Sequence, residues 1–194
     1  MNLNIPYMET DNKLLNDAYR IAAGDIVGNI VYYQNGLLTE EKPCMIAGLD
    51  YNTPWTRDTA INIWNALSIL SPEVSKNTLL AVLEEEEGNI YIGGQYWDSI
   101  IWMIGAREYC RFHKDDNFYR LAFEAGRNSV HRLEEDEFDE EDGLFRGPAV
   151  YGDGIAAYPD KYSKCPNQGS GILEWVDYPG NPVYPKGYGI PMKA

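Results

Sequence analysis

Cysteine and histidine are scarce in this chain of 194 residues, which contains three cysteines and two histidines. Cys44, Cys110 and Cys165 lie far apart, and their spacing fits neither a zinc site nor a disulfide framework. With His113 and His131 as the two imidazoles, a histidine-based metal centre is not expected. We therefore expect three free thiols, no metal site and no other cofactor.

Basic residues are also few, since 16 Lys and Arg stand against 30 Asp and Glu and give a formal net charge of −14. This balance argues against nucleic-acid backbones and anionic membranes as partners. No hydrophobic run reaches transmembrane length. The opening MNLNIPYMETDNK has neither the basic nor the apolar part of a signal peptide, which leaves the compartment unassigned with the cytoplasm as the default expectation.

Aromatic residues, in contrast, are plentiful, with 15 Tyr and 5 Trp in the chain. Apolar residues make up 44% of the sequence, which is typical of a folded protein with a core. Aromatic rings fill cores, and they also line sugar-binding clefts, because each ring offers a flat apolar face. We expect a single domain over residues 1–194.

The spacing of apolar residues predicts five helices, over about 11–34, 56–70, 72–87, 96–112 and 116–135. The expected caps are Thr10 or Asp11 for the first helix, Thr56 for the second, and Ser71 followed by Pro72 for the third. The first, third and fifth helices are apolar on one side. The second and fourth are apolar nearly all round, which indicates burial. The prediction is an all-α fold with alternating outer and inner helices.

Short connections make successive helices antiparallel, so the two buried helices should run parallel to each other. The segments AGLDYNTPW (47–55) and GNIYIGGQYW (88–97) lead into these helices. A long segment, 138–190, rich in Gly, Pro, Tyr and Asp, follows the fifth helix. All three segments should meet at one end of the inner helices, which makes that end the expected site.

The first candidate group is Trp55, Arg57 and Asp58 at the start of the second helix. Asp58 is favoured there by the helix dipole, and the planar guanidinium of Arg57 can bind a hydroxyl pair or a carboxylate. The structural alternative is a helix cap with an internal ion pair. Tyr96, Trp97 and Asp98 repeat the aromatic-carboxylate arrangement at the fourth helix, where the alternative is a capping Asp beside core aromatics.

The long segment holds two further candidate acids. Asp153 lies between two glycines, which is also typical of an ordinary turn. Asp177 belongs to Glu174-Trp175-Val176-Asp177-Tyr178, where the aromatic neighbours could desolvate it. Desolvation raises the pKa of a carboxyl group and allows proton donation near neutral pH, and the alternative is a solvated Asp in a packed loop. The acidic run at 134–143 does not match a calcium-binding loop and is expected to be a solvated helix end.

These motifs resemble those of the six-hairpin, or (α/α)6 toroid, glycosidases, and their order is most similar to the glucosidase domain of glycogen debranching enzymes and amylo-α-1,6-glucosidases. The resemblance extends over residues 14–194. The matching positions are an Arg-Asp-Thr at Arg57, Asp58 and Thr59; a compressed Tyr-x-x-x-Asp at Tyr96-Trp97-Asp98; an Asp-Gly-Leu at Asp142-Gly143-Leu144; the acid motif at Glu174-Trp175-Val176-Asp177; and a closing motif at Pro185-Lys186-Gly187-Tyr188.

The resemblance implies a partial (α/α)6 toroid with a long irregular active-site loop, and an inverting, α-glucosidase-like glycoside hydrolase. It nominates Asp177 as general acid, with Asp153 as the alternative, since related enzymes place their acid after a glycine turn in this loop. The sugar, an oligosaccharide or glycoside, would be held by Trp55, Arg57, Asp58, Tyr96, Trp97, Asp98 and Trp175.

In the family the general base comes from the second half of the toroid. The chain is therefore expected to be the N-terminal half of a catalytic domain, or a truncated fragment of such an enzyme, with little or no hydrolase activity alone. It is also expected to self-associate or to bind the missing C-terminal half. The alternatives are a non-catalytic carbohydrate-binding half toroid, a toroid of another chemistry such as a terpene cyclase relative, and a helical interaction scaffold.

Overall fold

The computed structural model describes residues 5–94, 97–141 and 143–145. The chain divides into two compact units, Met1–Val130 and His131–Ala194. Most of the second unit lies outside the described residues, so the expectation of one domain over 1–194 stays a prediction. The described part is mostly helical, which confirms the all-α class.

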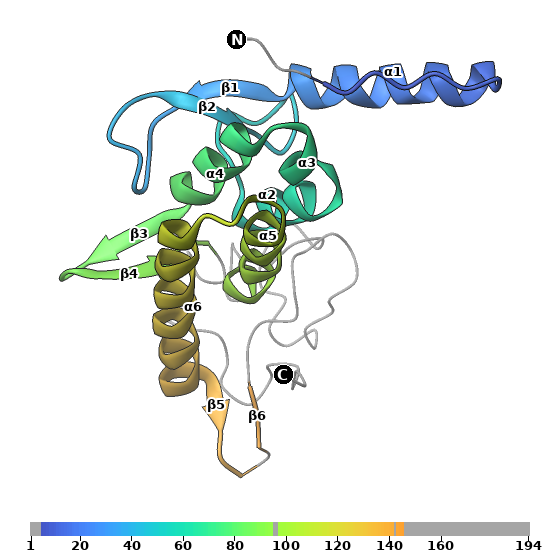
Figure 1. The fold of residues 1–194 in the computed structure, drawn as a ribbon. Coiled ribbons are helices and arrows are strands. Elements are labelled where there is room, and N and C mark those ends of the chain that lie inside the picture. Colours follow the sequence, from blue (N-terminus) through green and yellow to red (C-terminus); the bar gives the residue numbers. More distant parts are fainter. Residues whose placement is uncertain (1–4, 95–96, 142, 146–194) are drawn as a thin grey trace, which may run out of the picture. The chain divides into compact units, whose positions relative to one another are not determined.

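Five helical segments lie in the described residues, at the five places that the sequence predicts (Figure 1). The second is continuous from Thr56 to Leu70 but contains a π-helical turn. The segments are α1 (Lys13–Gly28), α2 (Thr56–Asn62) continuing through η1 (Ile63–Leu67) into α3 (Ser68–Leu70), α4 (Pro72–Ala81), α5 (Asp98–His113) and α6 (Asp116–Glu137). Three antiparallel hairpins of short strands accompany them: β1 (Ile30–Tyr33) with β2 (Lys42–Met45), β3 (Leu83–Glu86) with β4 (Asn89–Ile92), and β5 (Phe138–Asp139) with β6 (Leu144–Phe145).

The first predicted helix was too long at both ends. Its N-cap is Asn12, whose side chain accepts hydrogen bonds from the backbone N–H groups of Leu14 and Leu15, in place of the expected Thr10 or Asp11. The helix ends at Gly28, and the residues that follow form β1, where Ile30 pairs with Met45 and Tyr33 with Lys42. The branched and aromatic residues of β1 suit a strand, and this pairing outweighs their helical spacing.

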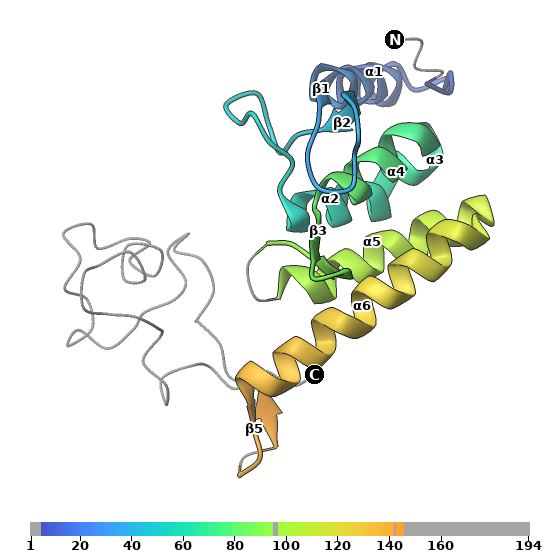
Figure 2. The same ribbon diagram turned by 90° about the vertical axis from the view of Figure 1, so that its left-hand side faces the viewer.

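The third predicted helix was also too long, because Glu84, Glu85 and Glu86 belong to a strand. The chain turns at Glu87 (φ 52°) and Gly88 (φ 80°), and both positive angles are those of a tight hairpin turn. Glu86 therefore lies opposite Asn89, and Leu83 opposite Ile92. This hairpin carries the chain from the end of α4 toward the start of α5 (Figure 2).

A turn between β1 and β2 packs against the C-terminal end of α4. Gly36 has a φ of +59°, and a Cβ at this position would lie 2.5 Å from the carbonyl oxygen of Leu83 and 2.6 Å from that of Leu80. The N–H of Leu37 donates to the Leu80 oxygen at 3.1 Å. The turn therefore satisfies a carbonyl group at the C-terminus of α4, and only glycine fits its closest approach.

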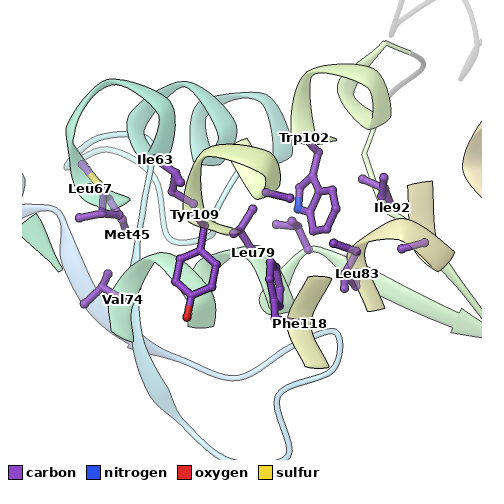
Figure 3. Close-up of a cluster of buried hydrophobic side chains, with 14 residues drawn as sticks. Met45, Ile63, Leu67, Val74, Leu79, Leu83, Ile92, Trp102, Tyr109 and Phe118 are labelled. Carbon is purple, nitrogen blue, oxygen red and sulfur yellow. The ribbon is translucent and has the colours of Figure 1, made fainter. Parts of the chain in front are cut away.

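The main core lies where η1, α4, α5 and α6 meet the first two hairpins (Figure 3). Trp102 and Phe118 are its largest fully buried side chains, and their ring centroids are 6.4 Å apart. Tyr109 packs edge-on against Phe118 at 5.0 Å. The amphipathic prediction for the fifth helix is confirmed, since Phe118, Ala122 and Ala125 are buried on one side of α6.

The second and fourth helices are buried on one side only, which corrects the prediction that they are buried nearly all round. Ile63 and Leu67 of η1 and Trp102 of α5 are buried, as expected. The opposite faces are exposed, because the described part of the chain places no further layer over them. The large exposed apolar residues are Ile61 (40%), Trp64 (50%) and Ile69 (59%) on the first of these helices and Ile100 (37%), Ile104 (37%) and Phe112 (43%) on α5.

The first helix is likewise less covered than its amphipathic pattern indicates. Leu14 is 80% exposed and Ile21 is 65% exposed, while Asn16 is the buried residue of α1. Asn16 joins the helix to the preceding segment, because its side-chain oxygen accepts a hydrogen bond from the backbone N–H of Thr10 at 2.8 Å. Ile26 is the α1 residue that packs against the main core.

A charged cluster fixes the start of α6. One carboxylate oxygen of Asp115 accepts from the backbone N–H of Phe118 at 3.0 Å, and the other lies 2.6 Å from the ammonium nitrogen of Lys76 in α4. The hydrogen bonds from Lys76 and the Phe118 N–H lower the pKa of Asp115. Burial, with Asp115 nearby, raises the pKa of Tyr109 to about 12. Asp115 is thus both the cap of α6 and its link to α4.

Replacing Asp115 with alanine is expected to lower the free energy of unfolding at pH 7 by about 1 kcal/mol, the usual loss for a helix cap. The folded-state pKa of Asp115 lies below its unfolded value, so the stabilisation is present above the unfolded pKa and is lost as the pH falls through the folded pKa. The difference between wild type and variant should therefore shrink below about pH 4. Urea unfolding at pH 7, 5 and 3 measures this difference in the free energy of unfolding. Asp116→Ala, a change at an exposed neighbour, is the control. An Asp115→Ala deficit that grew toward pH 3 would contradict the prediction.

Candidate functional site

Two of the three segments that were expected to meet do so at the starts of α2 and α5. The hydroxyl of Thr56 donates to the carbonyl oxygen of Gly93 at 2.8 Å, and Arg57 contacts Asp98. At the opposite end, a ring nitrogen of His113 is hydrogen-bonded to the Ser68 carbonyl oxygen. Since starts meet starts and ends meet ends, α2 with its continuation and α5 run parallel, as predicted from the sequence.

The helices approach closely in the middle because Gly105 has no side chain. A Cβ at Gly105 would lie 2.7 Å from the Cα of Ala60 and 3.0 Å from its carbonyl oxygen. Such distances leave no room for any side chain larger than hydrogen. Backbone contact at Gly105 therefore fixes the register of the two helices and brings their leading residues together.

The charged pair at this end joins the two helices to each other. The Nη1 atom of Arg57 lies 3.0 Å from Oδ1 of Asp98, so the ion pair of Arg57 is with α5. Asp98 is 2% exposed and lies in the first turn of α5, where the helix dipole favours a carboxylate. The Arg57 side chain is 31% exposed, so the guanidinium group lies at the boundary between core and solvent.

A glycine pair completes the junction. Gly94 has a φ of +113°, and a Cβ there would lie 2.7 Å from the Thr56 hydroxyl and 2.9 Å from Oδ2 of Asp98. The expectation that Thr56 caps its helix was wrong, because the N-cap is Trp55 and the Thr56 hydroxyl bonds Gly93 instead. The sequence reasoning missed Gly93 and Gly94, although two adjacent glycines shortly before a helix are a signal of close backbone approach.

Trp55 and Asp58 flank this junction on the α2 side. Trp55 is partly exposed, and its ring packs edge-on against Tyr51, with centroids 6.0 Å apart and ring planes at 77°. Its indole N–H is buried and has no hydrogen-bond partner among the described residues. Asp58 is partly exposed in the first turn of α2. Tyr51 was not among the predicted site residues, although it stands in the aromatic-rich segment that leads to α2.

On the α5 side, Trp97 is the residue before the helix and is 5% exposed. Trp97 and Asp98 are thus both on the buried side of the junction. Trp55, Arg57 and Asp58 lie nearer the surface. The structure thus brings together five of the predicted site residues. Tyr96, Asp153, Trp175 and Asp177 lie outside the described residues, and their places in the site stay predictions.

In the described part of the chain, no group of three or more His, Cys, Asp or Glu side chains is placed to hold a metal ion. Cys44 and Cys110 are free, and burial raises the pKa of the Cys44 thiol to about 12.

The acidic residues Glu134, Glu135 and Glu141 are exposed. Among the helices that the structure describes, none combines the length and the hydropathy that crossing a bilayer requires.

Comparison of the chain with protein-family models, with curated proteins and with solved structures gives no match. The interpretation of the site therefore depends on its own residues and geometry.

Proposed function

We propose that this chain forms the sugar-binding and proton-donating part of a glycoside hydrolase site, of the inverting, α-glucosidase-like type. In this proposal α2 with its continuation and α5 are neighbouring inner helices of an (α/α)6 toroid. Their leading ends bind the sugar. The long segment after α6 supplies the general acid.

The observation that carries the proposal is the junction of the two parallel helices by Arg57 and Asp98, 3.0 Å apart. Two helices adjacent in space but separated in sequence by α4 and a hairpin present their starts side by side. An aromatic ring and a carboxylate, Trp55 and Asp58, flank the charged pair on the accessible side. Sugars bind to such groups through ring faces and charged hydrogen-bonding partners.

The chemistry assigns one task to each group. The general acid, Asp177 or its alternative Asp153, protonates the glycosidic oxygen as the bond to the sugar breaks. A second carboxylate, roughly 6.5–9.5 Å from the first, removes a proton from the attacking water. Trp55 supports a face of the sugar ring, Arg57 and Asp58 bind its hydroxyl groups, and Asp98 holds Arg57 in position.

Sugar binding is tested by isothermal titration of the whole chain with glucose and with maltose. We expect a Kd on the order of 1 mM for the wild type with glucose, about 4 kcal/mol of binding free energy. Asp58→Asn should weaken binding about tenfold, because the amide replaces a charged acceptor with a neutral one. The matched control is Asp25→Asn, which changes an exposed acid of α1 and should leave binding unchanged. Absence of binding by the wild type would overturn the proposal.

A non-catalytic sugar-binding role is the second candidate. It is favoured by the position of Asp98, which is buried and paired with Arg57 and so is placed to orient that side chain rather than to activate water. Because the chain alone is expected to lack the general base, the two roles are separated with azide, an external nucleophile that needs no base to activate it. Azide attacks the sugar as the acid protonates the leaving oxygen, so glucose is released from maltose together with glucosyl azide. Azide-dependent glucose release that Asp177→Asn or Asp153→Asn abolishes supports a hydrolase site and identifies the acid. Sugar binding without such release supports the second candidate.

A further inference from the structure

The segment between β2 and α2 holds a second aromatic ring beside the proposed sugar site. Tyr51 is 51% exposed, while its edge-on neighbour Trp55 is partly buried. Their ring planes meet at 77° with centroids 6.0 Å apart, so the two rings form a corner. Trp55 is the N-cap of α2, two residues before Arg57, so the exposed Tyr51 ring lies next to the aromatic side chain at the start of the helix.

The Tyr51 ring packs against a turn of its own segment, and a hydrogen bond ties that segment to β1. The backbone N–H of Tyr51 donates to the Gly48 carbonyl oxygen at 3.0 Å, which closes a turn. The ring lies against that turn, since a Cβ at Gly48 would be 3.7 Å from its Cδ2 atom. Next along the chain, the Thr53 and Tyr33 hydroxyl groups are hydrogen-bonded at 2.8 Å, which ties the segment to β1. A ring fixed before binding loses little conformational freedom when a ligand packs on it.

We propose that Tyr51 is the contact surface for a second sugar unit, next to the unit that Trp55 and Arg57 bind. This inference rests on the proposed function. A single sugar ring can pack on one face of the aromatic corner, whereas a linked pair can occupy both. The site therefore prefers a disaccharide to a monosaccharide, and Tyr51 provides that preference. Leu49, 81% exposed in the same segment, has no aromatic face and provides the comparison.

The test compares maltose with glucose as ligands of the whole chain by isothermal titration. The wild type is expected to bind maltose about tenfold more tightly than glucose. Tyr51→Ala should remove this preference and leave the Kd for glucose unchanged. Tyr51→Phe should retain it, because the ring face remains. Leu49→Ala is the matched control and should behave like the wild type.

Each outcome decides the inference. If Tyr51→Ala weakens the binding of both sugars equally, Tyr51 supports the segment rather than a second sugar, and the inference is overturned while the proposed function stands. The same holds if Tyr51→Ala keeps the preference for maltose. If the wild type binds neither sugar, the proposed function fails and this inference fails with it. Thermal unfolding of each variant checks that the fold is retained, and Tyr51→Phe provides the comparison where alanine lowers stability.

Discussion

Replacing Gly105 with alanine is expected to destabilise the protein by about 1–3 kcal/mol and to weaken sugar binding. In an ordinary helix interior the same change stabilises, by up to about 1 kcal/mol, because alanine has the higher helix propensity. At Gly105 the new methyl group would lie 2.7 Å from the Cα of Ala60, which is backbone and cannot rotate away. The two parallel helices must then separate or slide, and the groups joined at their starts move with them.

The chain offers a matched control in Gly24, which lies inside α1 and where a new methyl group would meet no other group within 4 Å. Gly24→Ala should stabilise the protein by about 0.5–1 kcal/mol. Urea unfolding should show a loss of stability for Gly105→Ala and a gain for Gly24→Ala. Maltose titration should show weakened binding for Gly105→Ala only. If both variants gained stability, the inference that α2 and α5 are in close backbone contact at Gly105 would be wrong.

The sequence was sufficient to predict these two parallel helices but not their surroundings. Apolar spacing located all five helices, because the apolar residues of one helix face recur with the period of the helix. The strands at Ile30–Tyr33 and Leu83–Glu86 were missed, because their conformation depends on pairing with Lys42–Met45 and with Asn89–Ile92, which apolar spacing within each segment does not reveal. Glutamate has a low propensity for strands, yet three glutamates form one here. The tight turn at Glu87 and Gly88 sets their conformation instead.

Burial was harder to predict than helix position. A residue such as Trp64 or Ile100 is apolar whether or not a layer covers it, so pattern alone cannot separate a buried face from an exposed one. At the site, the sequence located the residues that begin each helix. The contact of Arg57 with Asp98 could not be derived from their positions in the chain, because it depends on the register that Gly105 and Gly94 set between the helices.

Replacing Arg57 with methionine is expected to have the second large effect, a loss of about 3 kcal/mol in the free energy of unfolding. Methionine keeps an apolar stem of similar length, so the change removes mainly the charge. Asp98 is 2% exposed, and a buried carboxylate deprived of its cation typically destabilises a protein by about 3–5 kcal/mol. The partial exposure of Arg57, 31% of its side chain, places the expected loss at the lower end.

A double-mutant cycle distinguishes the buried charge from other consequences of the change. If the uncompensated carboxylate causes the loss, Arg57→Met with Asp98→Asn should be more stable than Arg57→Met alone, because the amide is neutral. Lys13→Met is the control, since Lys13 pairs with Asp17 on the surface, with side-chain exposures of 89% and 36%. Its loss should be below about 1 kcal/mol and should shrink at high salt. Equal losses for Arg57→Met and Lys13→Met would mean that the Arg57–Asp98 pair does not join the two helices, and the sugar site proposed at their starts would lose its support.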